Sequence, residues 1–179
     1  MRIIAGTLKG RRLTSPKWDG LRPTSDRLRE TLFNVLGPSL QGARVLDAYA
    51  GTGAVGIEAL SRGAAHVTFV ESDRRAVDLI AANLAHCGVK DGYAIIRVDF
   101  ARAQSRLRGT EFDIIFLDPP YGVQELTAAL TAVAGLAGSE TRVVIEHARR
   151  DRAPHQVEAL VLTRELSSGD SGLAFYRKA

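Results

Sequence analysis

The stretch at residues 112–122, FDIIFLDPPYG, joins a short apolar run to two consecutive prolines. Residues 112–117 are rich in Ile and Phe, which predicts a buried strand. Pro119 and Pro120 lack an N–H and have a fixed φ, so they end the hydrogen-bonding ladder of the sheet at once. The strand therefore leads into a stiff loop that carries an acid, Asp118, and an aromatic ring, Tyr121. In open α/β sheets, ligands bind at this edge.

The polar groups of this loop suit a flat ring that bears an exocyclic amine. The carboxylate of Asp118 and the backbone carbonyl of Pro119 can each accept one N–H of the amine, and Tyr121 can stack on the ring. Two acceptors that hold both hydrogens pull the nitrogen toward tetrahedral geometry and aim its lone pair at an electrophile. We therefore assign the chemistry to Asp118, Pro119, Pro120 and Tyr121. The alternative is a rigid turn in which Asp118 is a cap and Tyr121 belongs to the core.

The composition predicts one domain, or one domain with a small appendage, because the chain has 179 residues of which 45% are hydrophobic. No apolar run approaches the roughly 18–20 residues of a membrane span. The start, MRIIAGTLKGRR, lacks the apolar segment of a signal peptide. The single cysteine, Cys87, excludes an internal disulfide and a multi-cysteine metal site. These features predict a cytoplasmic protein.

The positive charge is concentrated at the N-terminal end of the chain. The net charge is +4 and the sequence pI is about 9.6. Residues 1–30 hold eight basic and three acidic side chains, which gives +5, so the remaining residues sum to −1. This distribution is typical of a polyanion-binding appendage on a neutral domain. A solvated basic tail is the alternative.

The apolar pattern separates an N-terminal segment from an α/β domain. Residues 1–23 alternate weakly between Gly and Pro punctuation, which predicts a hairpin or an extended arm. A helix is expected after residues 24–25 and ends at Gly37 and Pro38. The expected domains are therefore a basic arm with a helix at 1–38 and an α/β domain at 39–179.

From residue 43 the pattern alternates between strands and helices. Strands are predicted at 44–48, 66–71, 93–98, 112–117 and 142–146, and helices at 54–62, 73–86, 101–107 and 123–137. Such alternation predicts parallel strands with helices on both faces. Residues 157–166 and 172–177 predict a closing antiparallel hairpin. The expected fold is α/β, with a mostly parallel seven-stranded sheet.

A second motif follows the first predicted strand. Residues 45–60 read VLDAYAGTGAVGIEAL and formally match G-x-G-x-x-G, with Glu71 about twenty residues on. Taken alone, the match predicts a dinucleotide site. However, the glycines of a dinucleotide site follow the strand directly, whereas residues 47–50, DAYA, stand before the glycines here. In addition, Asp47 puts a negative charge where it would repel a pyrophosphate. A cationic ligand, such as one with an ammonium or sulfonium group, fits Asp47 better.

Side chains near the ends of the next strands can complete a nucleoside site. Gly51 and Gly53 allow the backbone to approach a compact ligand, and Glu71, with Ser72 beside it, can accept both ribose hydroxyls. Asp99 can accept from an adenine amino group, and Phe100 can flank the base. Each acid alone is equally well explained as a helix cap or a surface residue. Their order at the ends of consecutive strands makes a shared crevice the better interpretation.

The motifs DAYAGTG and DPPY resemble those of class I S-adenosylmethionine-dependent methyltransferases that methylate amines. The opening, MRIIAGTLKGRRL followed by LRPTSDRLRETLFNVL, is similar to the bacterial RsmD family. The resemblance covers nearly the whole chain and implies a Rossmann-like methyltransferase fold over 39–179. It also implies methyl transfer from S-adenosylmethionine to the N2 amine of a guanine in 16S ribosomal RNA.

The resemblance further implies roles for the N-terminal segment. It suggests that this segment closes over the cofactor, which makes Thr24 and Arg27 candidates for cofactor binding. Phosphates of the RNA are expected to contact basic side chains, namely Arg2, Lys9, Arg11, Arg12, Arg22 and Arg29. The expected partner is 16S rRNA, either naked or within a partly assembled small subunit. No metal and no membrane partner are expected, and nothing in the sequence demands more than a monomer.

Several other functions stay open at this point. An amino methyltransferase acting on DNA would use the same DPPY loop. A protein-glutamine methyltransferase, a nucleic-acid-binding module without activity and a nicotinamide oxidoreductase are further alternatives. Methylation of a ring carbon through a cysteine adduct would need Cys87, but this residue ends a helix away from the predicted site and reads as a buried structural thiol.

Overall fold

The computed structural model describes residues 1–16, 18 and 24–179. It consists of two compact units, Met1–Phe100 and Ala101–Ala179, which are described in turn. No helix of the described residues is both long and apolar enough to cross a membrane. The sequence analysis divides the chain at residue 38 by expected function, into an RNA-binding segment and a methyltransferase domain. That division stays a prediction.

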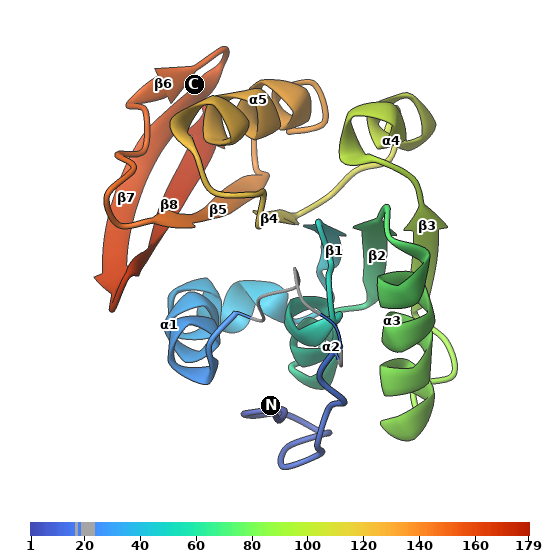
Figure 1. Cartoon of the computed structure of the whole chain (residues 1–179). Helices are drawn as coiled ribbons and strands as arrows, with labels where there is room; N and C mark the ends of the chain where they lie inside the picture. The colour runs from blue at the N-terminus through green and yellow to red at the C-terminus, as the bar shows by residue number, and fades with distance from the viewer. Residues whose placement is uncertain (17, 19–23) are drawn as a thin grey trace. The chain divides into compact units, whose positions relative to one another are not determined.

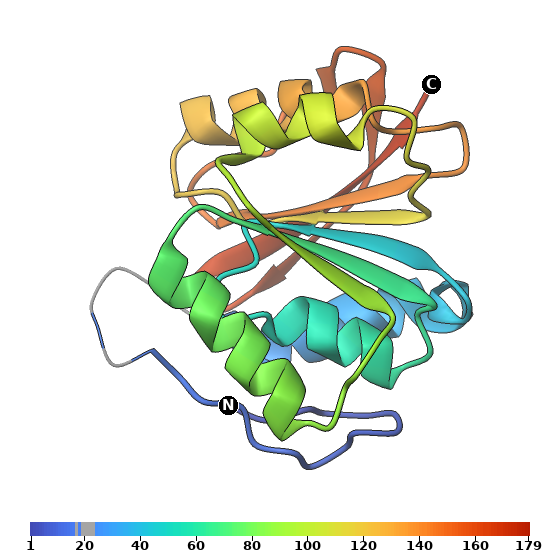
Figure 2. The same ribbon diagram turned by 90° about the vertical axis from the view of Figure 1, so that its right-hand side faces the viewer.

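The first unit combines the N-terminal arm with four helical segments and three strands. Its elements are α1 (Asp26–Leu36), the 3-10 helix η1 (Gly37–Leu40), β1 (Arg44–Ala48), α2 (Ala54–Ser61), β2 (His66–Glu71), α3 (Arg74–His86) and β3 (Tyr93–Arg97). The strands are parallel, in the order β3-β2-β1 (Figure 1). Figure 2 shows α2 and α3 on the same face of these strands. This arrangement brings the carboxyl ends of all three strands to one edge.

Local sequence accounts for the two helices that frame the arm. Ser25 caps α1 by accepting a hydrogen bond from the N–H of Leu28 at 3.2 Å, and the helix ends at Gly37 with φ +49°. In α2, Gly56 packs against the ring of Phe69 on β2. A Cβ at this position would lie 2.2 Å from a ring carbon. The third glycine of the G-x-G-x-x-G match therefore serves close helix–strand packing.

The arm is an ordered hairpin, as the sequence predicts. The N–H of Ile3 donates to the carbonyl of Arg11, and the N–H of Gly10 donates to the carbonyl of Ile3, both at 2.9 Å. Two buried side chains of α2 hold it. The Glu58 carboxylate accepts from the backbone N–H groups of residues 4 and 5 at 2.7 and 2.9 Å, and Ser61 Oγ donates to the carbonyl of residue 5 at 2.6 Å. The hairpin is therefore fixed to the first unit.

The second unit contains the other five strands. Its elements are α4 (Phe100–Leu107), which begins at the last residue of the first unit, β4 (Ile114–Leu117), α5 (Val123–Ala134), β5 (Arg142–Ala148), β6 (Gln156–Val157), β7 (Leu160–Ser168) and β8 (Ser171–Lys178). Strands β4 and β5 are parallel, whereas β5, β8, β7 and β6 pair antiparallel in that order. The predicted closing hairpin is thus confirmed.

The α/β class and the predicted order of elements are confirmed, with small differences at the boundaries. The structure adds the two-residue strand β6 to the seven predicted strands. Strand β4 begins at Ile114 rather than at residue 112, and β5 continues to Ala148 because its last residues pair with β8. Strand β3 ends at Arg97 rather than at residue 98, so Asp99 lies two residues past it, whereas β1, β2 and β4 end where the sequence predicts.

Replacing Glu58 tests the attachment of the arm. Its fully buried carboxylate accepts from Arg62 Nε at 2.8 Å and lies 3.6 Å from Arg29 Nη1, in addition to holding the arm. Glu58→Gln removes the carboxylate that pairs with Arg62, and it removes one of the two carboxylates that face Arg29. We expect the free energy of unfolding in urea to fall by about 3–5 kcal/mol. Glu30→Gln, at an exposed position of α1, is the control and is expected to change stability by less than about 0.5 kcal/mol. Equal stability of the two variants would contradict this role.

Candidate active site

Asp47 lies near the carboxyl end of β1, and its carboxylate is buried. Its Oδ2 accepts a hydrogen bond from the N–H of Gly56, in the first turns of α2, at 2.9 Å. Burial raises the pKa of Asp47 from 3.8 to about 7; the Gly56 N–H opposes this rise, and the charge of Glu71 adds to it. A positive charge bound nearby would favour the ionised form. The environment of Asp47 is therefore suited to a positively charged ligand, which would stabilise the ionised carboxylate.

The loop after β1 is held in an unusual backbone conformation. Tyr49, Gly51 and Gly53 have φ values of +83°, +54° and +75°. The N–H groups of Tyr49 and Ala50 both donate to the carbonyl of Val70, at 3.1 and 2.9 Å, which fixes the loop to the end of β2. A positive φ at a residue with a Cβ costs energy and is characteristic of functional sites. Sequence reasoning missed Tyr49, although it lies inside the DAYAGTG motif.

Glu71 ends β2 and is oriented by backbone N–H groups. Its Oε2 accepts from Gly51 at 2.9 Å, and its Oε1 accepts from Ser72 and Asp73 at 2.7 and 2.9 Å. The structure thus brings together three predicted cofactor residues, Gly51, Glu71 and Ser72. The side chain is half-buried, and a carboxylate oxygen with one hydrogen bond can accept another. These features fit the predicted contact with ribose hydroxyls.

The remaining predicted cofactor residues occupy different environments. Asp99 lies two residues past β3 and is exposed. Phe100 is 3% exposed, and its ring centroid is 5.4 Å from that of Tyr49 at a tilt of 54°. Thr24 is half-buried, and Arg27 is exposed on α1. Their contacts with a cofactor stay predictions.

A buried amide that sequence reasoning missed joins the arm to the loop after β1. Asn83, on α3, accepts from the N–H of Thr14 at 2.8 Å and donates to the carbonyl of the same residue at 3.2 Å. Its Nδ2 also donates to the carbonyl of Thr52 at 3.0 Å. One side chain therefore holds both the end of the arm and the glycine loop. The sequence offered no signal beyond a polar residue on the inner face of a predicted helix.

The basic residues of the N-terminal segment separate into two groups. Arg2, Lys9, Arg11 and Arg12 are exposed, and Arg22 lies outside the described residues. Arg29, in contrast, is fully buried.

The surroundings of Arg29 explain its burial. Its Nη2 donates to the carbonyl of Arg2 at 2.8 Å and pairs with Asp26 at 2.6 Å. Such burial is at odds with the predicted phosphate contact of Arg29. This arginine instead holds the arm in place.

The DPPY loop follows β4 in the second unit. Asp118 is half-buried, Pro119 is buried and Pro120 is exposed. Tyr121 is 38% exposed, which excludes its assignment to the core. Its hydroxyl lies 3.2 Å from Ser171 Oγ, at the start of β8. The ring is thus both accessible and anchored.

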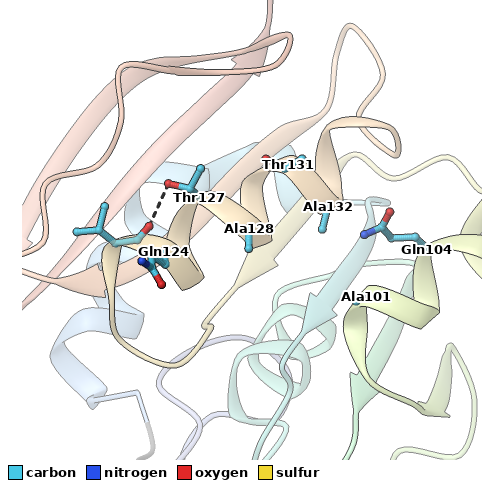
Figure 3. A pocket seen from close by; sticks show the side chains of 8 residues that line it. Ala101, Gln104, Gln124, Thr127, Ala128, Thr131 and Ala132 are labelled. Carbon is cyan, nitrogen blue, oxygen red and sulfur yellow. Dashed lines mark hydrogen bonds between the residues drawn. The ribbon is translucent and has the colours of Figure 1, made fainter.

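A groove on the second unit contains none of the predicted site residues in its lining. It has a volume of about 680 Å³ and is lined by residues of α4 and α5, with Gln104 and Gln124 among small side chains (Figure 3). Thr127 on its wall donates to the carbonyl of Val123 at 3.0 Å. The lining contains no titratable group, so it offers no acid or base for catalysis.

The raised pKa of Asp47 leads to a test by pH. The folded state binds this proton more tightly than the unfolded state, so the contribution of Asp47 to stability falls as the pH rises from about 4 to about 7. Asp47→Asn keeps an oxygen for the Gly56 N–H and cannot ionise. We expect the variant to gain stability relative to the wild type, by up to about 1.4 kcal/mol per pH unit, between pH 5 and pH 7. Urea unfolding across this range measures the difference, and parallel profiles for the two proteins would contradict the shift.

Comparison with known proteins gives the family. A family model described as Conserved hypothetical protein 95 matches residues 1–177. A putative rRNA methyltransferase of Bacillus subtilis, YlbH, is 40% identical, with 99% of each chain covered. Ribosomal RNA small subunit methyltransferase D of Escherichia coli K12 is also 40% identical, over 99% of this chain and 90% of the relative.

A solved structure agrees with this relationship. The putative methyltransferase yhhF from Escherichia coli has a TM-score of 0.84 and 36% identity, over 99% of this chain and 97% of its own. The fold is therefore that of a Rossmann-like class I methyltransferase. With the motifs and the full-length similarity together, the chain belongs to the ribosomal RNA small subunit methyltransferase D family.

Proposed function

We propose that this protein transfers a methyl group from S-adenosylmethionine to the N2 amine of a guanine in 16S ribosomal RNA. Membership of the methyltransferase family supports the reaction class, and the names of the relatives support ribosomal RNA as the substrate. The DPPY loop is the observation that supports an amine as the methyl acceptor. It combines acceptor groups at Asp118 and Pro119 with an exposed, anchored ring at Tyr121.

The first unit has residues that fit the cofactor. S-adenosylmethionine, when bound, supplies a methyl group on a positively charged sulfonium. Asp47 is a buried carboxylate whose pKa of about 7 a neighbouring cation would lower, so its negative charge suits this group. Glu71 is held by backbone N–H groups with acceptor capacity left for the ribose hydroxyls. The positive φ angles of Gly51 and Gly53 permit a close approach of the backbone to the ligand.

The DPPY loop is assigned to the target base. Asp118 and the carbonyl of Pro119 accept the two hydrogens of the amine, and Tyr121 stacks on the guanine ring. The reaction depends on positioning and needs no covalent intermediate on the protein. Asp118 or water takes up the proton that the amine releases. The base has to leave its stack to reach the loop, which costs a few kcal/mol and less in a loop of RNA.

The arm is assigned to the RNA backbone. Arg2, Lys9, Arg11 and Arg12 are exposed on a hairpin that Glu58, Ser61 and Asn83 hold in place. A fixed hairpin presents its charges at defined positions, and this loses less entropy on binding than a mobile tail would. The expected substrate is 16S rRNA, either naked or in a partly assembled small subunit.

Transfer of a tritiated methyl group tests the proposed substrate. The purified protein is incubated with labelled S-adenosylmethionine and with total RNA or genomic DNA from a strain that lacks the gene. We expect the label in 16S rRNA, and digestion should release it as N2-methylguanosine. Label in DNA, or on another atom of the base, would overturn the assignment.

Asp118→Ala tests the role of the loop. Without the carboxylate, one of the two acceptors for the amine is lost, so methyl transfer should fall by at least about a hundredfold. Cofactor affinity, measured by calorimetry, should stay within about tenfold because Asp118 is assigned to the base. Glu125→Ala, which removes an exposed carboxylate from the first turn of α5, is the control and should retain activity. Full activity of the Asp118 variant would exclude the proposed role.

Replacing two arginines tests the arm. Arg11 and Arg12 are both exposed, and the double replacement by Ala should weaken RNA binding and reduce the slope of log K against log salt by about one per lost phosphate contact. Filter binding at several salt concentrations measures this slope. Arg44→Ala removes an exposed charge at the start of β1, outside the arm, and should leave the slope unchanged. An unaltered slope in the arm variant would argue against RNA binding there.

A further inference from the structure

The second unit contains a local group of arginines, although the net charge of the chain outside residues 1–30 is only −1. Residues 148–152, which begin at the last residue of β5, read ARRDR. Arg149, Arg150 and Arg152 are exposed. The N–H of Asp151 donates to the carbonyl of Ala148 at 2.8 Å and closes a tight turn. We call residues 149–152 the basic turn.

The acid and the arginines of the basic turn differ in exposure. The side chain of Asp151 is 15% exposed, whereas that of Arg150 is 83% exposed. The Nε of Arg150 lies 3.9 Å from Asp151 Oδ1, which is too long for a hydrogen bond. Within the described part of the chain, Arg149 and Arg152 form no ion pair. The turn therefore presents mainly positive charge to solvent.

The basic turn lies next to the DPPY loop. Ala148 is paired with Ser171 across β5 and β8, and the N–H of Arg149 donates to the carbonyl of Asp170 at 2.8 Å. Ser171 in turn lies within hydrogen-bond distance of the Tyr121 hydroxyl, at 3.2 Å. Two short links thus connect the turn to the aromatic ring. The nearby exposed acid is Asp170, whose charge reduces but does not cancel that of three arginines.

We propose that the basic turn binds the RNA phosphates that flank the base held by Tyr121. This inference rests on the proposed function. A base that stacks on Tyr121 brings the phosphates on either side of it to the same edge of the second unit. Guanidinium groups match phosphate geometry and bind it through paired hydrogen bonds. The turn would therefore hold the strand at the target nucleotide, separately from the arm.

The role of the basic turn predicts a specific kinetic effect. Its arginines contact the RNA and neither the cofactor nor the amine. Removing them should raise the KM for RNA and leave cofactor affinity unchanged. A purely structural role would instead lower the melting temperature and affect all parameters together.

The test compares two sets of three arginines in the full-length protein. The test variant is R149A/R150A/R152A. The control, R106A/R108A/R177A, removes three exposed arginines that lie in the last turn of α4, just after α4 and near the end of β8. Binding of 16S rRNA is measured by filter assay at several salt concentrations, S-adenosylmethionine binding by calorimetry, and folding by thermal melting.

We expect the test variant to bind RNA at least about tenfold more weakly at physiological salt and to lose about two units of the salt slope. The control should lose less than half as much affinity. R149K/R150K/R152K keeps the charges and should keep the slope. If the test variant melts early, the single change R150A, at a side chain that is 83% exposed, replaces it and should reduce the slope by about one unit.

Two results would overturn the inference. The first is an affinity and slope of the test variant equal to those of the control. The second is unchanged binding to naked rRNA with weaker binding to ribosomal particles, which would point to a protein partner. Failure of the proposed function looks different: the wild type would then bind no S-adenosylmethionine or would methylate no RNA. The RNA-binding comparison decides the role of the turn in either case.

Discussion

The attachment of the arm to the first unit depends on the interactions of the buried Glu58 carboxylate. This carboxylate is fully buried. It accepts hydrogen bonds from two backbone N–H groups of the arm, and it pairs with the guanidinium groups of Arg29 and Arg62. A charge in this position is tolerated only because so many partners compensate for its lost hydration. The consequence is that a short, glycine-containing, basic segment is attached to α1 and α2 and behaves as part of the folded domain.

The loop after β1 also combines a costly buried carboxylate with backbone N–H groups that compensate for part of this cost. Asp47 and Glu71 carry like charges close enough to influence each other, and burial makes the ionised form of Asp47 costly. Backbone N–H groups compensate in part, and the positive φ at Tyr49 adds strain. Such an arrangement is not optimal for the free protein. It is well suited to a ligand that brings one positive charge and several hydroxyl groups.

Much of the fold could be predicted because the signals were local. The Ile-rich run before Pro119 predicted β4, and two strand-like runs joined by SSGDS predicted the hairpin of β7 and β8. The polar residues that hold the arm could not be predicted in this way. Glu58 accepts from its backbone partners across more than fifty residues of sequence, and Arg29, which the sequence places on the surface, is buried against the distant Glu58. In the site, Asp47 and Glu71 followed from strand ends, whereas Tyr49 and Asn83 depend on tertiary contacts.

The amide of Asn83 has a consequence for how the first unit responds to its ligands. A single NH₂ group serves the carbonyls of Thr14 and Thr52, so neither segment can shift without altering the geometry of the other's hydrogen bond. The amide of Asn83 thus connects the end of the arm to the glycine loop. The side chain of Asn83 therefore links the geometry of the arm to that of the glycine loop through two hydrogen bonds.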